Sequence, residues 1–204
     1  MNMILSSCDF RNEKSRKVII DHLPKPIEEC KVLFLPNEKA TLEAIHSEKF
    51  YRRMQEFGFA RENVTVFDYY DPSQYFGLDI DLLYVSGGNT LKTIDRIRKS
   101  GFDHEMIRYI KSGVTYIGGS AGAHVVTQDV SHVTCYDDAP EEMIDFRGLG
   151  LFDGILICHY TPQRQVHYEK LLSVGKYKVY TLTDEESIVI KDRKLIFYSA
   201  AHFG

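Results

Sequence analysis

The sequence lacks any long hydrophobic run. No apolar stretch approaches the ~18 residues that a membrane-spanning helix requires. The segment from Met1 to Cys8 has neither a basic part nor an extended apolar part, so it does not resemble a secretory signal peptide. We therefore expect a cytoplasmic protein with no membrane partner.

The chain also lacks a strong excess of either charge. It has 25 basic and 29 acidic residues, which give a formal net charge of −4. Nucleic-acid binding depends on a concentrated basic surface. We therefore expect no nucleic-acid partner.

Recognisable metal and cofactor motifs are missing as well. The four cysteines show no CxxC spacing, and Cys30 and Cys158 lie at or beside apolar strand-like runs, which is typical of buried free thiols in a reducing compartment. HExxH, EF-hand, Walker A and G-x-G-x-x-G patterns are absent. We expect no bound metal and no cofactor.

The sequence does contain a regular alternation of apolar strands and helical segments. Strand-like runs occupy 3–6, 31–35, 64–67, 80–85, 114–117 and 155–158, and helical spacing occupies 40–57, 90–98, 104–111 and 164–174. Three short strands follow at 178–183, 187–190 and 195–199, with acidic 184–186 as a turn. This alternation predicts an α/β three-layer sandwich, with a mostly parallel open sheet, helices on both faces and antiparallel edge strands near the C-terminus. No linker or repeat divides it, so we expect one domain over 1–204.

Ser120 is the strongest candidate for a catalytic residue. It lies in Gly118-Gly119-Ser120-Ala121-Gly122, which matches G-x-S-x-G between a strand and a helical segment. A nucleophile on such a sharp turn has a strained backbone, and small neighbours avoid Cβ clashes. The backbone N–H of Ala121 would then be an oxyanion donor. A structural turn or a phosphate-holding loop is the alternative.

Two further features lie at the carboxyl ends of neighbouring strands, where functional groups gather in parallel sheets. Gly87-Gly88 precedes Asn89 in a second strand-to-helix turn, so the Gly88 N–H is a candidate second oxyanion donor and Asn89 a helix cap or substrate contact. His159 directly follows a buried strand and is the candidate general base, with His124, His132 and His167 as competing candidates. His124, four residues after Ser120, is a candidate pocket-lining residue.

The acid that would complete a triad is ambiguous in the sequence. A triad needs a carboxylate to orient the imidazole and to stabilise its positive charge. Asp137-Asp138-Ala139-Pro140-Glu141-Glu142, between Ser120 and His159, contains four acids. A solvated acidic loop is the alternative interpretation of each of them.

Four motifs taken together resemble the serine peptidase family of peptidase E (aspartyl dipeptidase) and cyanophycinase, family S51. They are Gly87-Gly88-Asn89-Thr90, Gly119-Ser120-Ala121-Gly122-Ala123, Gly148-Leu149-Gly150-Leu151-Phe152 and, after a strand, His159-Tyr160. The resemblance covers about residues 80–169. It implies a class I glutamine amidotransferase-like (flavodoxin-like) fold.

By position, the resemblance implies Ser120 as nucleophile, His159 as base, and Gly88 and Ala121 as oxyanion donors. The Asp138-Ala139-Pro140 stretch resembles the family's acid-bearing segment and favours Asp138.

A one-residue slip would give Asp137 as the acid, and Glu141 or Glu142 stay open because some relatives use a glutamate. The basic stretch with which peptidase E reads an N-terminal aspartate is absent from 161–167, where Arg164 is the candidate substitute.

These features predict a serine exopeptidase or dipeptidase that acts on short peptides. An esterase or other acyl hydrolase with the same triad is a second hypothesis, and a catalytically silent binding protein on the same scaffold is a third. A homodimer is compatible with the sequence, which does not fix an oligomeric state.

Overall fold

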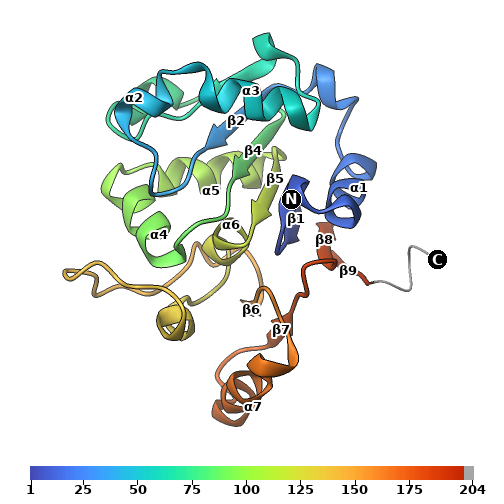
Figure 1. The fold of residues 1–204 in the computed structure, drawn as a ribbon, viewed down its shortest axis with the longest axis vertical. Helices are drawn as coiled ribbons and strands as arrows, with labels where there is room; N and C mark the ends of the chain where they lie inside the picture. The colour runs from blue at the N-terminus through green and yellow to red at the C-terminus, as the bar shows by residue number, and fades with distance from the viewer. Residues whose placement is uncertain (200–204) are drawn as a thin grey trace.

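Seven strands form the central sheet, in the order β3-β2-β4-β5-β1-β8-β9 (Figure 1). The computed structural model describes residues 1–199, so the last five residues of the expected 1–204 domain lie outside the described part. The first five strands of this sheet pair in parallel, and the last two pair antiparallel. This confirms the predicted mostly parallel sheet with antiparallel edge strands. The strands are β1 (Asn2–Ser6), β2 (Val32–Leu35), β3 (Val64–Val66), β4 (Leu82–Val85), β5 (Thr115–Gly119), β8 (Ser187–Lys191) and β9 (Lys194–Tyr198).

Helices cover both faces of the central sheet, with α1 and α3 on one side and α4, α5 and α6 on the other (Figure 1). No helix within residues 1–199 is both long and apolar enough to span a membrane. The α-helices are α1 (Glu13–Asp21), α2 (Leu42–Ile45), α3 (Glu48–Phe57), α4 (Thr90–Lys99), α5 (Asp103–Ser112), α6 (Ala121–Val125) and α7 (Gln165–Val174).

The expected continuous helix over 40–57 is instead two helices, α2 and α3. Ser47 starts the second one: its hydroxyl donates to the Ala44 carbonyl and accepts from the Lys49 N–H. A serine that bonds the backbone in this way is a typical helix N-cap, and it competes with a continuous helix. Gly58 ends α3 as expected, in the left-handed region at φ 114°.

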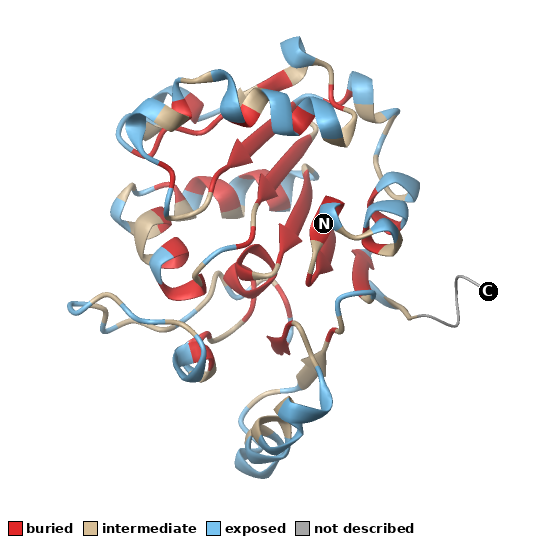
Figure 2. Ribbon diagram, in the orientation of Figure 1, coloured by how far each residue is buried: buried red, intermediate tan, exposed pale blue. Residues whose placement is uncertain are grey.

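The hydrophobic core is centred on the parallel strands of the central sheet. Every residue of β2, β4 and β5 is buried, which matches the continuous apolar runs in the sequence (Figure 2). Strands buried on both faces have fixed positions, so their carboxyl ends provide a rigid edge for the loops that follow.

A second, two-stranded sheet consists of β6 (Ile155–Ile157) and β7 (Val179–Thr181). The two strands pair in parallel, with Ile157 opposite Thr181, and α7 connects them. The expected turn at 184–186 therefore does not join two strands of a hairpin, because β7 pairs with β6 rather than with β8. The carboxyl ends of β6 and β7 lie at the same edge, which brings residues 158–160 beside residues 182–184.

Candidate active site

Ser120 occupies the sharp turn between β5 and α6. Its backbone has φ 50° and ψ −107°, a conformation that costs free energy for a residue with a side chain. The neighbouring glycines leave room for this turn. A Cβ on Gly122 would lie 2.1 Å from the Val85 carbonyl oxygen, and a Cβ on Gly118 would lie 2.7 Å from the Gly122 carbonyl oxygen. The G-x-S-x-G pattern is thus required by close packing around Ser120.

His159 faces Ser120 from the other sheet. It lies two residues beyond β6, and its Nε2 is 2.9 Å from Ser120 Oγ. The backbone of His159 is also in the left-handed region, at φ 53°, and its N–H donates to Ser7 Oγ at 2.9 Å. Ser7 Oγ in turn donates to the Leu182 carbonyl oxygen at 2.9 Å. Ser7 therefore joins the chain beyond β6 to the chain beyond β7.

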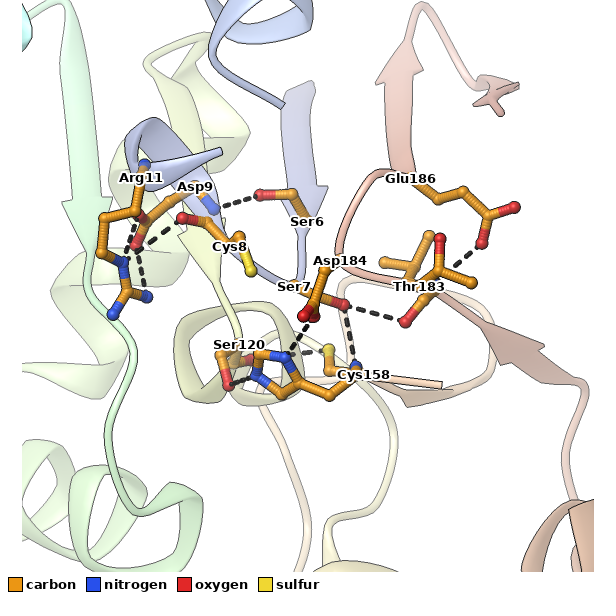
Figure 3. A network of polar contacts seen from close by, with 12 residues as sticks. Ser6, Ser7, Cys8, Asp9, Arg11, Ser120, Cys158, Thr183, Asp184 and Glu186 are labelled. Atoms are coloured by element: carbon orange, nitrogen blue, oxygen red, sulfur yellow. Dashed lines mark hydrogen bonds and ion pairs between the residues drawn. The ribbon is translucent and has the colours of Figure 1, made fainter. Parts of the chain in front are cut away.

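Asp184 completes the line of polar contacts. Its Oδ1 lies 2.6 Å from His159 Nδ1 (Figure 3). Because a carboxylate only accepts hydrogen bonds, Nδ1 must carry the proton, which leaves Nε2 of a neutral imidazole to accept the Ser120 hydroxyl proton. Partial burial raises the pKa of Asp184, but hydrogen bonds from His159 and from the Cys8 thiol outweigh it and hold the pKa below its usual value.

The expectation of Asp138, or of Asp137 by a one-residue slip, is corrected by this geometry. Asp137 Oδ2 accepts from the Thr90 N–H at 2.7 Å, at the start of α4. Asp138 is exposed, and its backbone carbonyl accepts from Asn89 Nδ2 at 3.0 Å. The first turn of a helix has N–H groups without intrahelical partners, and the 137–138 segment satisfies that need at α4 instead of reaching His159.

The two alternative acids, Glu141 and Glu142, are exposed to solvent in the same loop. The carboxylate that contacts His159 thus comes from a segment that the sequence pattern suggested was only a turn. The available signal was that Asp184 directly follows the apolar run at 178–183, whose pairing with β6 the sequence did not reveal.

Gly87 and Gly88 bring a second stretch of backbone to Ser120. A Cβ on Gly87 would lie 3.2 Å from the Ser120 Cβ. A Cβ on Gly88 would lie 2.3 Å from Glu38 Oε2, so this position has no room for a side chain. Ala121 is the first residue of α6, where a backbone N–H has no partner within the helix.

A cavity of about 250 Å³ opens beside Ser120 and His159. Gly88, His124 and Arg164 contribute to its lining. Arg164 donates to the Cys158 carbonyl, and its guanidinium lies 4.1 Å from the centre of the Tyr136 ring.

Asn89 does not line this cavity. Its Oδ1 caps α4 by accepting from the Lys92 N–H at 2.8 Å, and its Nδ2 bonds Asp138. The expected substrate contact is therefore a helix cap, which was the alternative interpretation.

His124 is buried behind the cavity, with both ring nitrogens engaged. Nε2 lies 3.1 Å from the Leu156 carbonyl oxygen, and Nδ1 lies 3.4 Å from Thr90 Oγ1. Burial lowers the pKa of His124 to about 4, so the imidazole is neutral at pH 7. A neutral imidazole fixed at both nitrogens connects α6, β6 and α4 rather than exchanging protons.

The sequence is similar to those of several known proteins. An uncharacterised peptidase of Listeria monocytogenes, Lmo0363, is 28% identical over 122 residues, which is 57% of this chain and 59% of that protein. Peptidase E of a Nostoc species is 27% identical over 132 residues, 64% of this chain and 52% of its own length. The chain thus matches somewhat more than half the length of these relatives.

A solved structure and a family model extend the comparison to nearly the whole chain. A crystal structure of a Listeria monocytogenes protein described as a candidate peptidase E covers 97% of both chains with a TM-score of 0.75 at 20% identity, which shows a common fold. The model of Peptidase family S51 matches residues 3–198. On this match the chain belongs to peptidase family S51.

Proposed function

We propose that the protein is a serine exopeptidase that cleaves short peptides. The observation that carries this proposal is the continuous line from Ser120 Oγ through the His159 imidazole to the Asp184 carboxylate, with distances of 2.9 Å and 2.6 Å. These are the contacts that a Ser–His–Asp triad requires, and the line opens into a cavity.

In the proposed reaction, His159 Nε2 takes the proton of Ser120 as the hydroxyl oxygen attacks the scissile carbonyl. Asp184 keeps the proton on Nδ1 and stabilises the imidazolium that forms. His159 then gives its proton to the leaving amine. Water, activated by the same imidazole, releases the acyl group from Ser120.

The negative charge on the carbonyl oxygen needs two donors in this scheme. We assign them to the backbone N–H groups of Gly88 and Ala121, because both belong to segments packed against Ser120. Backbone donors at fixed positions stabilise the developing charge without reorganisation. Removal of one such donor typically costs about 10²- to 10³-fold in rate.

The cavity supports short peptides with free ends as substrates. Its lining includes the Arg164 guanidinium and the Asp137 carboxylate, which provide one positive and one negative charge within a volume of about 250 Å³. A dipeptide or tripeptide carries one charge of each sign at its termini. We therefore expect acetylation of the substrate's amino terminus to reduce kcat/KM.

The test combines a fluorophosphonate label with a substrate panel. We expect wild-type protein to be labelled and to hydrolyse free peptides, and Ser120→Ala to lose both properties while keeping the wild-type circular dichroism spectrum. Ser131→Ala, which changes a serine outside the triad, is the matched control. Faster turnover of simple esters than of any peptide would favour a general acyl hydrolase, and absence of labelling in the folded protein would favour a silent binding protein.

A further inference from the structure

Cys8 adds a third metal-binding side chain beside two members of the triad. One donor atom each from Cys8, His159 and Asp184 lies within 4.8 Å of the other two. The Cys8 thiol lies near the Asp184 carboxylate, which accepts from His159 Nδ1 (Figure 3). The three residues follow β1, β6 and β7, so three strand ends converge on one point.

The donor set matches the preferences of zinc. Zn²⁺ binds thiolate sulfur, imidazole nitrogen and carboxylate oxygen, and it commonly takes three protein ligands plus one water in an open tetrahedral site. A thiolate and a carboxylate together carry two negative charges, which balance the charge of the ion. Magnesium and calcium prefer oxygen ligands alone and do not match this set.

The geometry allows such an ion with a small side-chain movement. Metal–ligand bonds of about 2.0–2.3 Å place tetrahedral donor atoms roughly 3–4 Å apart, so the 2.6 Å contact between His159 Nδ1 and Asp184 Oδ1 must widen by about 1 Å. The Asp184 side chain is 59% exposed, which leaves it free to make this change. The nearby cation Arg11 is paired with Asp9 at 2.9 Å, and that pairing offsets its charge.

We propose that Cys8, His159 Nδ1 and Asp184 form an inhibitory site for Zn²⁺. Binding releases the Cys8 thiol proton to solvent and requires a free electron pair on Nδ1. The imidazole proton therefore moves from Nδ1 to Nε2, and Nε2 becomes a donor that cannot take the Ser120 proton. The inhibition rests on the proposed function of the triad, whereas the binding itself does not.

The binding test uses Co²⁺ as a spectroscopic substitute for Zn²⁺ on the metal-free full chain. We expect a sulfur-to-cobalt charge-transfer band and the intense visible bands of tetrahedral Co²⁺, both displaced by Zn²⁺. Cys8→Ser and Cys8→Ala should lose the charge-transfer band and weaken Zn²⁺ binding by at least about tenfold. Cys135→Ser, which removes another accessible thiol, is the matched control and should keep both signals.

Ser120→Ala separates this proposal from the proposed function. It keeps all three ligands, so we expect it to bind Co²⁺ as the wild type does although it cannot be labelled. Zn²⁺ should block labelling of the wild type, and EDTA should restore it. A charge-transfer band that survives in both Cys8 variants, or no band in any folded protein, would overturn the site. Co²⁺ binding without labelling of the wild type would overturn the proposed function alone.

Discussion

Ser7 holds His159 in place from a distance of 152 residues along the chain, because the His159 N–H donates to the Ser7 hydroxyl at 2.9 Å. The same hydroxyl donates to the Leu182 carbonyl, two residues before Asp184. One buried serine directly after β1 thus positions the segments that carry the proposed base and acid. It supports a strained histidine, whose φ of 53° a free chain would seldom adopt.

Replacement of Ser7 should therefore affect stability and activity together. Ser7→Ala leaves the His159 N–H without its partner, and we expect a loss of about 1–3 kcal/mol in the free energy of unfolding. The rate of hydrolysis should fall more than KM rises, because the imidazole loses its fixed orientation. Urea unfolding and steady-state kinetics measure the two effects. Ser173→Ala, which removes only a local hydroxyl bond to Lys170 on α7, is the control and should change stability by less than about 0.5 kcal/mol.

Two aspartates can be compared directly by the same substitution. Asp184→Asn places a neutral amide at His159 Nδ1, which favours the wrong imidazole tautomer and should lower kcat/KM by about 10²- to 10⁴-fold. Asp138→Asn keeps the backbone carbonyl that bonds Asn89, so its activity should match that of the wild type. Equal loss in both variants, or a larger loss in Asp138→Asn, would contradict the assignment of Asp184.

Gly122 should not tolerate even one additional carbon. A Cβ there would lie 2.1 Å from the Val85 carbonyl oxygen, a backbone atom that cannot rotate away. We expect Gly122→Ala to cost about 1–3 kcal/mol or more and to displace Ser120, so that fluorophosphonate labelling is lost.

Gly101→Ala is the comparison for this steric effect. Its Cβ would meet nothing within 4 Å, but its φ of +69° imposes backbone strain. We expect a cost of roughly 1 kcal/mol with labelling intact. Similar labelling of the two variants would show that the contact with Val85 does not position the nucleophile.

The buried His124 should make stability fall in mild acid. Its pKa is lowered from 6.5 to about 4 in the folded protein, so between these values the unfolded chain binds more protons than the folded one. Stability from this residue is therefore complete above about pH 6.5 and decreases as pH falls toward 4, by on the order of 2 kcal/mol between pH 7 and pH 5. Urea unfolding at a series of pH values measures this slope. His124→Gln should reduce this slope but not abolish it, because burial also lowers the pKa of His132 to about 3. An unchanged slope would contradict the assignment to His124.

Local sequence signals were sufficient to single out Ser120 and His159, the proposed nucleophile and base. The apolar run at 114–117 predicted a buried strand ending at Ser120, and the run at 155–158 did the same for His159. In both cases the residue lies within two positions of the end of the strand that positions it. The order of strands in the sheet was not needed to recognise them.

Identification of the proposed acid required knowledge of the strand pairing, and the local sequence pattern indicated the wrong pairing. Short apolar runs at 178–183 and 187–190, separated by acidic residues, are typical of a hairpin. The first run instead pairs in parallel with β6 across α7, and that pairing carries Asp184 to His159. Asp138 was favoured because Asp138-Ala139-Pro140 resembles the acid-bearing segment of the family. The sequence did not reveal that the start of α4 binds this segment.

The proposed nucleophile and its two partners follow different sheets: Ser120 follows the central sheet, whereas His159 and Asp184 follow the small sheet of β6 and β7. On the proposed function, activity therefore depends on how the two sheets are docked. A local opening that separates the small sheet would move His159 and Asp184 away from Ser120 while the central sheet stays folded. We therefore expect this local opening to abolish the reactivity of Ser120 reversibly, without global unfolding.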